Sequence, residues 1–297
     1  MKKLMIFGGG GFVGGNMTRT AQEKGWKVCI ADSFFRPGLE NVEWAEADIT
    51  DQEGVDAAFE KIKPDAAVNL AAIADIDKAE KDKEAAWKVN VEGAANIAAS
   101  CARRGVKYVF FSSDAVFDGE GAGYTEEDRT APVNYYGHTK AEAEKLIFTA
   151  CPTAVIIRIS LVIGFPVTGG NSFFAGLVKK LSEGMEIVCP PDEVRTPIDV
   201  HTLSECVLEL AGSDFSGILH IGATDSISRF ELTKKAAKRM GYEDTPVKLQ
   251  KDANSGSGRA PRHKNGIICV DKARNILKTR LLSVDEALDR IFLTTRE

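Results

Sequence analysis

The first half of the chain alternates between strand-like runs and segments with helical periodicity. Strand-like runs of four to six residues lie at 4–7, 27–31, 43–46, 66–70 and 106–111. Helical segments lie between them, up to residue 24, at about 50–61 and at 83–104. Such alternation predicts a doubly wound (Rossmann) α/β fold, in which helices cover both faces of a parallel sheet.

Beyond residue 160 the alternation becomes irregular. A strand-like run at 153–159 is followed by helical segments at 171–183, 201–211 and 228–240, by a short strand at 218–221, and by a C-terminal helix. Capping boxes at Ser228 with Glu231 and at Ser283 with Glu286 mark two of the helix starts. We predict a dinucleotide-binding domain at 1–160, rejoined by 196–221, and a smaller α/β substrate domain at 161–195 and 222–297.

A glycine-rich turn joins the first strand to the first helix. Its spacing, Gly8-x-x-Gly11-x-x-Gly14, removes side chains where a pyrophosphate must approach the backbone. The N–H groups at the helix start can then receive the anion. The alternative is a glycine turn without a ligand.

The second strand ends at Asp32, about 20 residues past the glycine turn. A carboxylate there can accept both hydroxyls of an adenosine ribose, and it would repel the 2′-phosphate of NADP. The position therefore favours NAD, although Arg36 lies close enough that NADP stays open. Asp48 either faces the adenine or forms a turn.

Two further segments carry groups suited to catalysis. Tyr136 and Lys140 lie four residues apart at a predicted helix start, so they share a helix face. A nearby ammonium favours the phenolate, and each unit taken off the pKa of a tyrosine is worth about 1.4 kcal/mol. The alternative is a solvated lysine packed on an exposed tyrosine. Ser112, Ser113 and Asp114 follow a strand, at the edge where a parallel sheet binds ligands.

Composition narrows the class of protein. The 297 residues are 44% hydrophobic and carry 38 Lys and Arg against 43 Asp and Glu, a formal charge of −5, with no basic stripe for nucleic acid. Six scattered cysteines indicate reduced thiols in a cytoplasmic protein, and four unclustered histidines give no sign of a metal site or histidine chemistry. No apolar run reaches 18 residues, so we expect no membrane span.

In this order and spacing, the glycine turn, Asp32, Ser113 and Tyr136-x-x-x-Lys140 resemble the extended short-chain dehydrogenase/reductase family. Within it, segments 75–80, 112–119 and 136–140 are most similar to dTDP-4-dehydrorhamnose reductases and their relatives. The resemblance implies that Tyr136 exchanges a proton with the sugar carbonyl or hydroxyl, and that Ser113 bonds the same oxygen. It also implies that Lys140 holds the nicotinamide ribose and depresses the pKa of Tyr136.

The candidate site residues follow from these patterns and from the resemblance. The candidate cofactor-binding residues are Gly8, Gly11, Phe12, Val13, Gly14, Asp32, Asp48, Ile49, Leu70, Ala71, Ala72, Ser112, Tyr136 and Lys140. The candidate substrate-binding residues are Asp114, Asn171, Phe173, Arg195, Arg259 and Arg262. The arginines could bind a nucleotide diphosphate or pair with surface carboxylates. Asn171 could cap a helix, and Phe173 could belong to the core.

One departure from the family bears on the reaction. Members that dehydrate sugar nucleotides carry an Asp-Glu pair after the hydroxyl residue, whereas this chain has Asp114-Ala115. The missing second carboxylate argues against a dehydratase. It leaves an NAD(P)-dependent reductase of a 4-keto sugar nucleotide or an NAD-retaining 4-epimerase. A non-catalytic regulatory subunit is the alternative of another class, and a homodimer is possible. Reductases usually carry an aromatic residue where Ala115 stands, so the sugar stays open.

Overall fold

The computed structural model describes residues 1–34, 38–121, 123–168, 171–190, 192–243, 247–249 and 259–294. Arg36, which kept NADP open above, lies outside the described residues.

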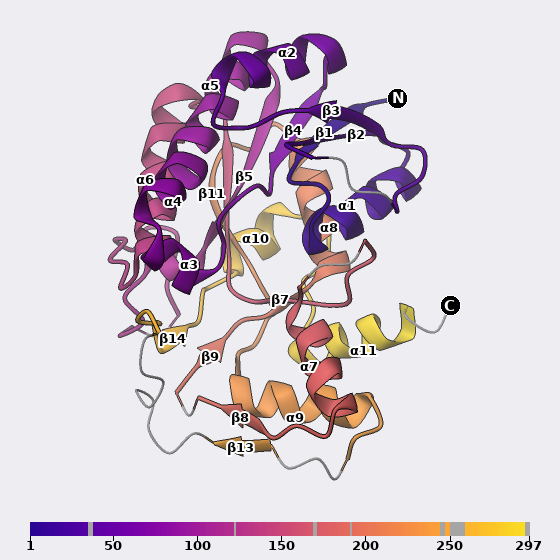
Figure 1. Cartoon of the computed structure of the whole chain (residues 1–297), viewed down its shortest axis with the longest axis vertical. Helices are drawn as coiled ribbons and strands as arrows, with labels where there is room; N and C mark the ends of the chain where they lie inside the picture. The colour runs from indigo at the N-terminus through magenta and orange to yellow at the C-terminus, as the bar shows by residue number, and fades with distance from the viewer. Residues whose placement is uncertain are drawn as a thin grey trace.

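A seven-stranded sheet with every neighbouring pair parallel organises the molecule (Figure 1). Its order is β11-β6-β5-β4-β1-β2-β3. The strands are β1 (Lys3–Phe7), β2 (Lys27–Asp32), β3 (Glu43–Glu46), β4 (Ala66–Asn69), β5 (Lys107–Ser113), β6 (Val155–Ile159) and β11 (Gly217–Ile221). The strand order reverses between β1 and β4, which is where ligands bind in sheets of this kind. The predicted doubly wound fold is confirmed.

Helices cover both faces of this sheet (Figure 1). The core on one face includes residues of α1 (Phe12–Glu23), α8 (Val200–Ala211) and α10 (Asp271–Ile276). The core on the other includes residues of α2 (Gln52–Ile62), α5 (Ala94–Arg104) and α6 (Tyr135–Ala150). Within β1, Leu4 and Ile6 face the first core while Met5 and Phe7 face the second. Because successive side chains of a strand point to opposite faces, a strand buried on both sides is apolar throughout.

The predicted helix at 83–104 is interrupted. It consists of α4 (Lys83–Trp87), a π-helical turn η1 (Lys88–Gly93), and α5. Asn90 in the π turn accepts a hydrogen bond from the Ile73 N–H at 2.8 Å and donates to the Thr139 hydroxyl at 3.0 Å. The turn thus connects the segment after β4 to the helix that carries Tyr136 and Lys140, in keeping with the frequent place of π turns at functional sites.

The sequence offers Thr50 as the N-cap of α2, with Glu53 three residues on as in a capping box, and this prediction was wrong by one residue. Asp51 is the N-cap, and its carboxylate accepts from the Glu53 N–H at 3.1 Å. Thr50 instead donates its N–H and hydroxyl to Asp48, at 2.9 and 2.8 Å. The carboxylate of Asp51 is among the most favourable capping groups, so it takes the position from the threonine.

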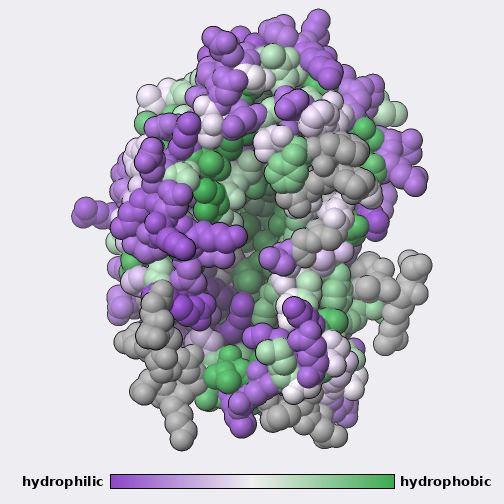
Figure 2. Space-filling model, in the orientation of Figure 1, coloured by the Kyte–Doolittle hydropathy of each residue, from purple (hydrophilic) through white to green (hydrophobic). Residues whose placement is uncertain are grey.

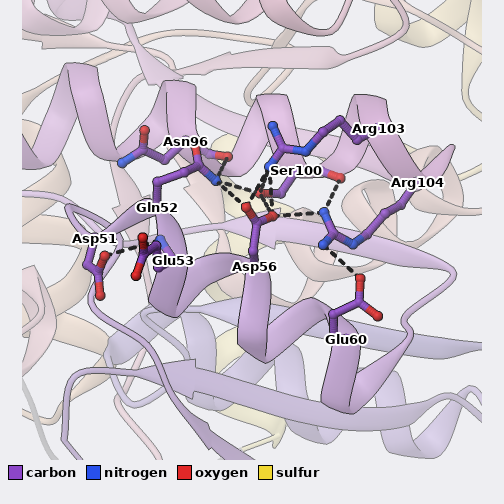
Figure 3. A network of polar contacts seen from close by, with 9 residues as sticks. All are labelled: Asp51, Gln52, Glu53, Asp56, Glu60, Asn96, Ser100, Arg103 and Arg104. Atoms are coloured by element: carbon purple, nitrogen blue, oxygen red, sulfur yellow. Dashed lines mark hydrogen bonds and ion pairs between the residues drawn. The ribbon is translucent and has the colours of Figure 1, made fainter.

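A polar network fixes α2 to α5 (Figure 3). The Asp56 carboxylate accepts from Ser100 at 2.8 Å and from Arg103 and Arg104 at 2.7 and 2.8 Å. Burial raises the pKa of Asp56, but its hydrogen bonds to Arg103, Ser100 and Arg104 outweigh this and lower the pKa to about 2. The two helices are therefore held together outside the apolar core as well as within it.

A smaller lobe lies beyond the carboxyl ends of the sheet strands (Figure 1). Its own core joins α7 (Phe173–Ser182), α9 (Arg229–Arg239) and α11 (Val284–Thr294). The strands outside the large sheet are β7 (Val162–Ile163), β8 (Ile187–Cys189), β9 (Val194–Arg195), β10 (Ile198–Asp199), β12 (Ile227–Ser228), β13 (Val247–Leu249) and β14 (Asn265–Gly266). The predicted domain boundaries stay a prediction, and α10, from the C-terminal part, packs on the core of the large sheet. No helix in the described ranges is long and apolar enough to cross a membrane.

Candidate active site

The glycine turn brings the start of α1 against the ends of β1 and β4. A Cβ on Gly14 would lie 2.6 Å from the Gly9 Cα, so the helix packs against the turn only without a side chain there. The N-cap of α1 is Gly11, which offers no side chain to the first N–H groups of the helix. The backbone N–H groups of Phe12 and Val13 could therefore bind an anion, as the sequence predicts.

Candidate residues at the ends of β2 and β4 flank this turn. Asp32 lines a small cavity together with Gly10, Phe34 and Trp44. Its carboxylate accepts the Ser33 N–H at 2.9 Å. After β4, Leu70, Ala71 and Ala72 are half-buried, and the Ala71 N–H is tied to the Asn69 side chain at 3.0 Å. The apolar rings of Phe34 and Trp44 were not anticipated as part of this site.

Asp48 and Ile49, two further predicted cofactor residues, make contacts within the protein. Of the two alternatives for Asp48, the structure shows the turn, because the carboxylate accepts from both groups of Thr50. Ile49 is 6% exposed and packs in the sheet core, where a Cβ on Gly93 would lie 2.6 Å from it. Its carbonyl oxygen accepts from Asn96 at 2.9 Å. Ile49 thus packs in the core, and its part in cofactor binding stays a prediction.

Helix α6 is docked tightly on the end of β5. Its N-cap, Asn134, accepts the Gly137 N–H at 2.9 Å and donates to the Pro261 carbonyl at 3.0 Å. A Cβ on Gly137 would collide with the carbonyl of Ala115. This close approach places Tyr136 beside Ser113, so the two predicted catalytic residues converge from separate elements on one cavity.

Tyr136 is strongly biased toward its protonated form. Burial raises the pKa of Tyr136 to about 12, the negative charge of Asp114 adds to the increase, and hydrogen bonding with Ser113 opposes it. The Lys140 ammonium donates to the Phe111 carbonyl at 2.9 Å and lies 5.9 Å from the Tyr136 ring centroid. Burial also lowers the pKa of Lys140 to about 7. The expected lowering of the tyrosine pKa by Lys140 is therefore not seen, because the ammonium is directed elsewhere and is itself readily discharged.

Behind Lys140 lies a buried ion pair. Glu144, one helical turn further along α6, accepts from Arg158 of β6 at 2.7 and 3.0 Å. The Ser112 hydroxyl also donates to Glu144 at 2.5 Å, so the side chain of this predicted cofactor residue is engaged inside the protein. The Glu144 charge raises the pKa of Lys140, against the larger effect of burial.

Asp114 lies at the centre of a cluster that draws on distant parts of the chain. Its Oδ1 accepts the Ser113 hydroxyl at 3.0 Å, and its Oδ2 accepts the Ser160 hydroxyl at 2.7 Å. The same Oδ2 lies 3.1 Å from His263 Nε2 and 3.5 Å from Arg195 Nε. Burial raises the pKa of Asp114, but His263, Arg195 and Ser160 outweigh it and leave the pKa below its ordinary value.

Two adjoining cavities open beside these groups, and Figure 2 shows the surface hollowed between the sheet and the smaller lobe. One, of about 510 Å³, is lined by Ser113, Asp114, Tyr136 and His263, among others. The other, of about 340 Å³, is lined by Phe173, Leu177 and Cys189 of the smaller lobe. Glu193, Arg229 and Arg259 line both cavities. The arrangement can accommodate a two-part ligand whose halves meet at these arginines.

The remaining predicted substrate residues differ in whether they line a cavity and in what they contact. Phe173 lines the second cavity under the Arg229 guanidinium, 4.1 Å from its ring centroid. Arg262 pairs with Asp77 through contacts of 2.7 Å, and Arg259 lies 3.8 Å from the same carboxylate. Arg195 donates to backbone carbonyls of Val194, Lys264 and His263 at 2.8 to 3.1 Å. Asn171 is exposed and contributes to neither cavity wall.

Sequence reasoning missed Arg229 and His263. Arg229 is the first residue of α9, and burial lowers its pKa, as do the neighbouring charges of Arg195 and Arg259, while Glu193 opposes them. An anion in the cavity would relieve this crowding of positive charge. The capping box before Arg229 was the one available signal, and it indicated only a helix start. Within the described parts of the chain, no group of three or more acidic, histidine or cysteine side chains could hold a metal ion.

Comparison with known proteins agrees with this geometry. The model of the RmlD substrate binding domain family matches residues 1–296. The spore coat polysaccharide biosynthesis protein SpsK of Bacillus subtilis is 30% identical over 244 residues, 82% of this chain and 81% of that one. The dTDP-4-dehydrorhamnose reductase of Mycobacterium tuberculosis H37Rv is 30% identical over 259 residues, 83% and 78% of the two chains. Among solved structures, the dTDP-4-dehydrorhamnose reductase of Bacillus anthracis in complex with NADP superposes with a TM-score of 0.89, at 27% identity over 99% and 100% of the chains.

Proposed function

The chain belongs to the RmlD substrate binding domain family, and from this premise we propose that it reduces a 4-keto sugar nucleotide with a nicotinamide cofactor. The convergence of Tyr136 and Ser113 on one cavity at the carboxyl end of β5 carries the proposal. That cavity continues past a group of arginines into a second one, as a sugar joined to a nucleotide diphosphate requires. Two of the named relatives are dTDP-4-dehydrorhamnose reductases.

The residues present fit a dinucleotide. The helix start at Phe12, the close packing of Gly14 on Gly9, and the small residues Ala71 and Ala72 leave backbone N–H groups and space for a pyrophosphate. Asp32 would take the adenosine ribose, and Phe34 and Trp44 would flank the adenine. When bound, the cofactor supplies the hydride.

The protein supplies the proton and the orientation. Ser113 and Tyr136 would both bond the carbonyl oxygen of the sugar, and Tyr136 would release its proton to that oxygen as negative charge develops there. Lys140, fixed by the Phe111 carbonyl, would present its remaining N–H groups to the nicotinamide ribose. The diphosphate would lie among Arg229 and Arg259, and the base would occupy the cavity lined by Phe173 and Leu177.

Reduction is favoured over 4-epimerisation by the two relatives named dTDP-4-dehydrorhamnose reductase. In a reductase Tyr136 would donate a proton to the ketone, whereas in an epimerase it would first remove a proton from the sugar hydroxyl. Burial and the charge of Asp114 raise the pKa of Tyr136, a direction that suits the donor role. The cavity beside an intact set of Ser113, Tyr136 and Lys140 also favours an enzyme over a regulatory subunit.

A substrate panel tests the proposal. Purified protein is incubated with dTDP-4-dehydrorhamnose or another 4-keto sugar nucleotide, and oxidation of NADH and NADPH is followed by absorbance. We expect one nucleotide cofactor to be oxidised for each sugar reduced. Tightly retained NAD, with interconversion of two sugars and no net oxidation, would instead establish an epimerase. No turnover of any keto sugar nucleotide, together with a co-purifying enzyme partner, would indicate a regulatory subunit.

A further inference from the structure

We propose that His263 is a positioning residue for the proposed reduction. It holds the Asp114 carboxylate against Ser113, and its charge sets how readily Tyr136 releases a proton. This inference rests on the proposed function, in which Tyr136 is the proton donor.

The first step of the argument is the contact between His263 and Asp114. His263 Nε2 lies 3.1 Å from Asp114 Oδ2, and the two side chains are only 3% and 5% exposed. In so buried a place, charge on one side chain acts strongly on the other, because little water screens it. His263 is the foremost of the groups that hold the pKa of Asp114 below its ordinary value against the opposing effect of burial.

The second step is the connection from Asp114 to Tyr136. The Ser113 hydroxyl donates to Asp114 Oδ1 at 3.0 Å and takes part in a hydrogen bond with Tyr136. After burial, the negative charge of Asp114 is the main cause of the raised pKa of Tyr136. A change of charge on His263 therefore reaches the phenol in two ways, through space and through the hydrogen bonds of Ser113.

The third step concerns how His263 and Asp114 are packed. A Cβ on Gly266 would collide with Asp114 Oδ2 and would lie 2.8 Å from His263 Nε2. Among the described residues, neither Nδ1 nor Nε2 of His263 has a hydrogen-bond partner of good geometry, so the close contact of Nε2 with Asp114 is electrostatic. Two such nitrogens cost stability in a buried position. Buried ion pairs are also weak sources of stability compared with apolar packing. A pair that is costly to bury and borders the catalytic cavity is better explained by function than by folding.

The fourth step is to name the charged and titratable groups around His263. Asp114 lies against the His263 imidazole, Arg195 contacts the same carboxylate, and Tyr136 lies beyond Ser113. Lys140, whose pKa burial lowers to about 7, lies near Tyr136 on α6 and also changes charge near neutral pH. The neighbouring Arg262 is paired with Asp77 on α3 (Ile76–Lys81). Between pH 5 and 8 histidine is the side chain that ordinarily changes charge. Protonation of His263 therefore makes the cluster of Asp114, Arg195 and His263 more positive by one charge.

The direction of the effect follows from electrostatics. A positive charge near the phenol stabilises the phenolate that remains after proton donation. Reduction should be faster when His263 is protonated and slower once it is neutral. With an effective dielectric constant near 20 and partial proton transfer in the transition state, we expect a change of about threefold to tenfold.

The experiment is a pH profile of single-turnover reduction by the full-length enzyme, saturated with cofactor and substrate, between pH 5 and 9. The ratio of the wild-type rate to the His263→Gln rate should fall by about threefold to tenfold as the pH rises, because any step that Lys140 causes near pH 7 is common to both enzymes. The ratio of the wild-type rate to the rate of His138→Gln, which removes an exposed histidine from the same helix as Tyr136, should stay constant. An active enzyme in which the ratio of wild type to His263→Gln does not change with pH would overturn the proposal.

A second measurement tests the link between Asp114 and Tyr136 in the free protein, without turnover. The absorbance of tyrosine phenolate is measured against pH in the variant Asp114→Asn and in the double variant Asp114→Asn with Tyr136→Phe. Subtracting the second curve from the first leaves the titration of Tyr136. Compared with the same difference in wild type, the midpoint should move to lower pH. An unchanged midpoint would overturn the link from the cluster to Tyr136, even if His263→Gln failed to fold. Absence of reductase activity with a shifted midpoint would instead contradict the proposed function.

Discussion

The Lys140 ammonium donates to the backbone carbonyl oxygen of Phe111 at 2.9 Å, which ties α6, the helix that carries Tyr136, to the strand that ends in Ser113. Burial at this contact lowers the pKa of Lys140 to about 7, although Glu144 opposes the decrease. Lys140 is thus a buried amine that loses its proton near neutral pH. This property can be tested in the free protein, without substrate or cofactor.

The first prediction concerns stability against pH. An unfolded lysine has a pKa of about 10.4, so between about pH 7 and 10 the unfolded chain binds a proton that the folded protein has released. The free energy of unfolding of wild type should therefore rise with pH across this window relative to Lys140→Met, by no more than about 5 kcal/mol. Urea unfolding at several pH values measures the difference. Lys145→Met, which removes an exposed lysine of α6 paired with Glu142, should run parallel to wild type. A Lys140→Met curve that also ran parallel would contradict the assigned pKa.

The second prediction concerns the proton donor. Tyr136→Phe should lower kcat by about 10²-fold or more, because general acid catalysis contributes this much, while folding and cofactor binding persist. Tyr135→Phe is the matched control, since Tyr135 packs against His138 and Lys83 on the other side of the helix start. Steady-state kinetics and cofactor titration measure both variants. Wild-type turnover in Tyr136→Phe would remove Tyr136 from the mechanism.

The strands of the large sheet were predictable because burial on both faces makes each a continuous apolar run, as in Leu4 to Phe7. The neighbouring positions of Tyr136 and Lys140 on α6 were predictable because they lie about one helical turn apart, while their catalytic role stays a prediction. The π turn around Asn90 was not, since its residues continue an ordinary helical pattern. The two-residue strands of the smaller lobe, such as β9, are too short to show a period. His263 was dismissed because its partner Asp114 is near it only after folding.

The third prediction concerns the choice of cofactor. Wild type should bind NADH more tightly than NADPH, because the Asp32 carboxylate would repel a 2′-phosphate. Asp32→Ala should reduce this preference by about tenfold, the effect of roughly 1.4 kcal/mol of repulsion. Fluorescence titration with both cofactors gives the dissociation constants. Glu46→Gln is the control, because Glu46 pairs in register with Asp32 on β3 and is exposed. An equal change in both variants would show that general surface charge, and not Asp32, selects the cofactor.

The fourth prediction concerns the diphosphate. Arg229→Met should raise KM for the sugar nucleotide about tenfold to a hundredfold with little change in kcat, since the contact would be equal in ground and transition states. Arg239→Met is the control, because Arg239 lies near the other end of α9 and pairs with Asp285 and Asp289. Initial rates over a range of substrate concentrations separate the two constants. An unchanged KM would place the diphosphate elsewhere.

The fifth prediction concerns the ion pair of Glu144 and Arg158, which supports Lys140 from behind. Their side chains are 6% and 3% exposed, so Arg158→Met would leave the Glu144 carboxylate buried without its counter-ion. We expect a loss of about 3 to 5 kcal/mol in the free energy of unfolding, because removing one partner of a buried pair leaves an uncompensated charge. The double variant Glu144→Gln with Arg158→Met should recover much of this loss, since no buried charge remains. Urea unfolding of both variants at one pH measures the recovery. If the double variant were as unstable as Arg158→Met, loss of packing by the arginine side chain, and not the stranded charge, would explain the destabilisation.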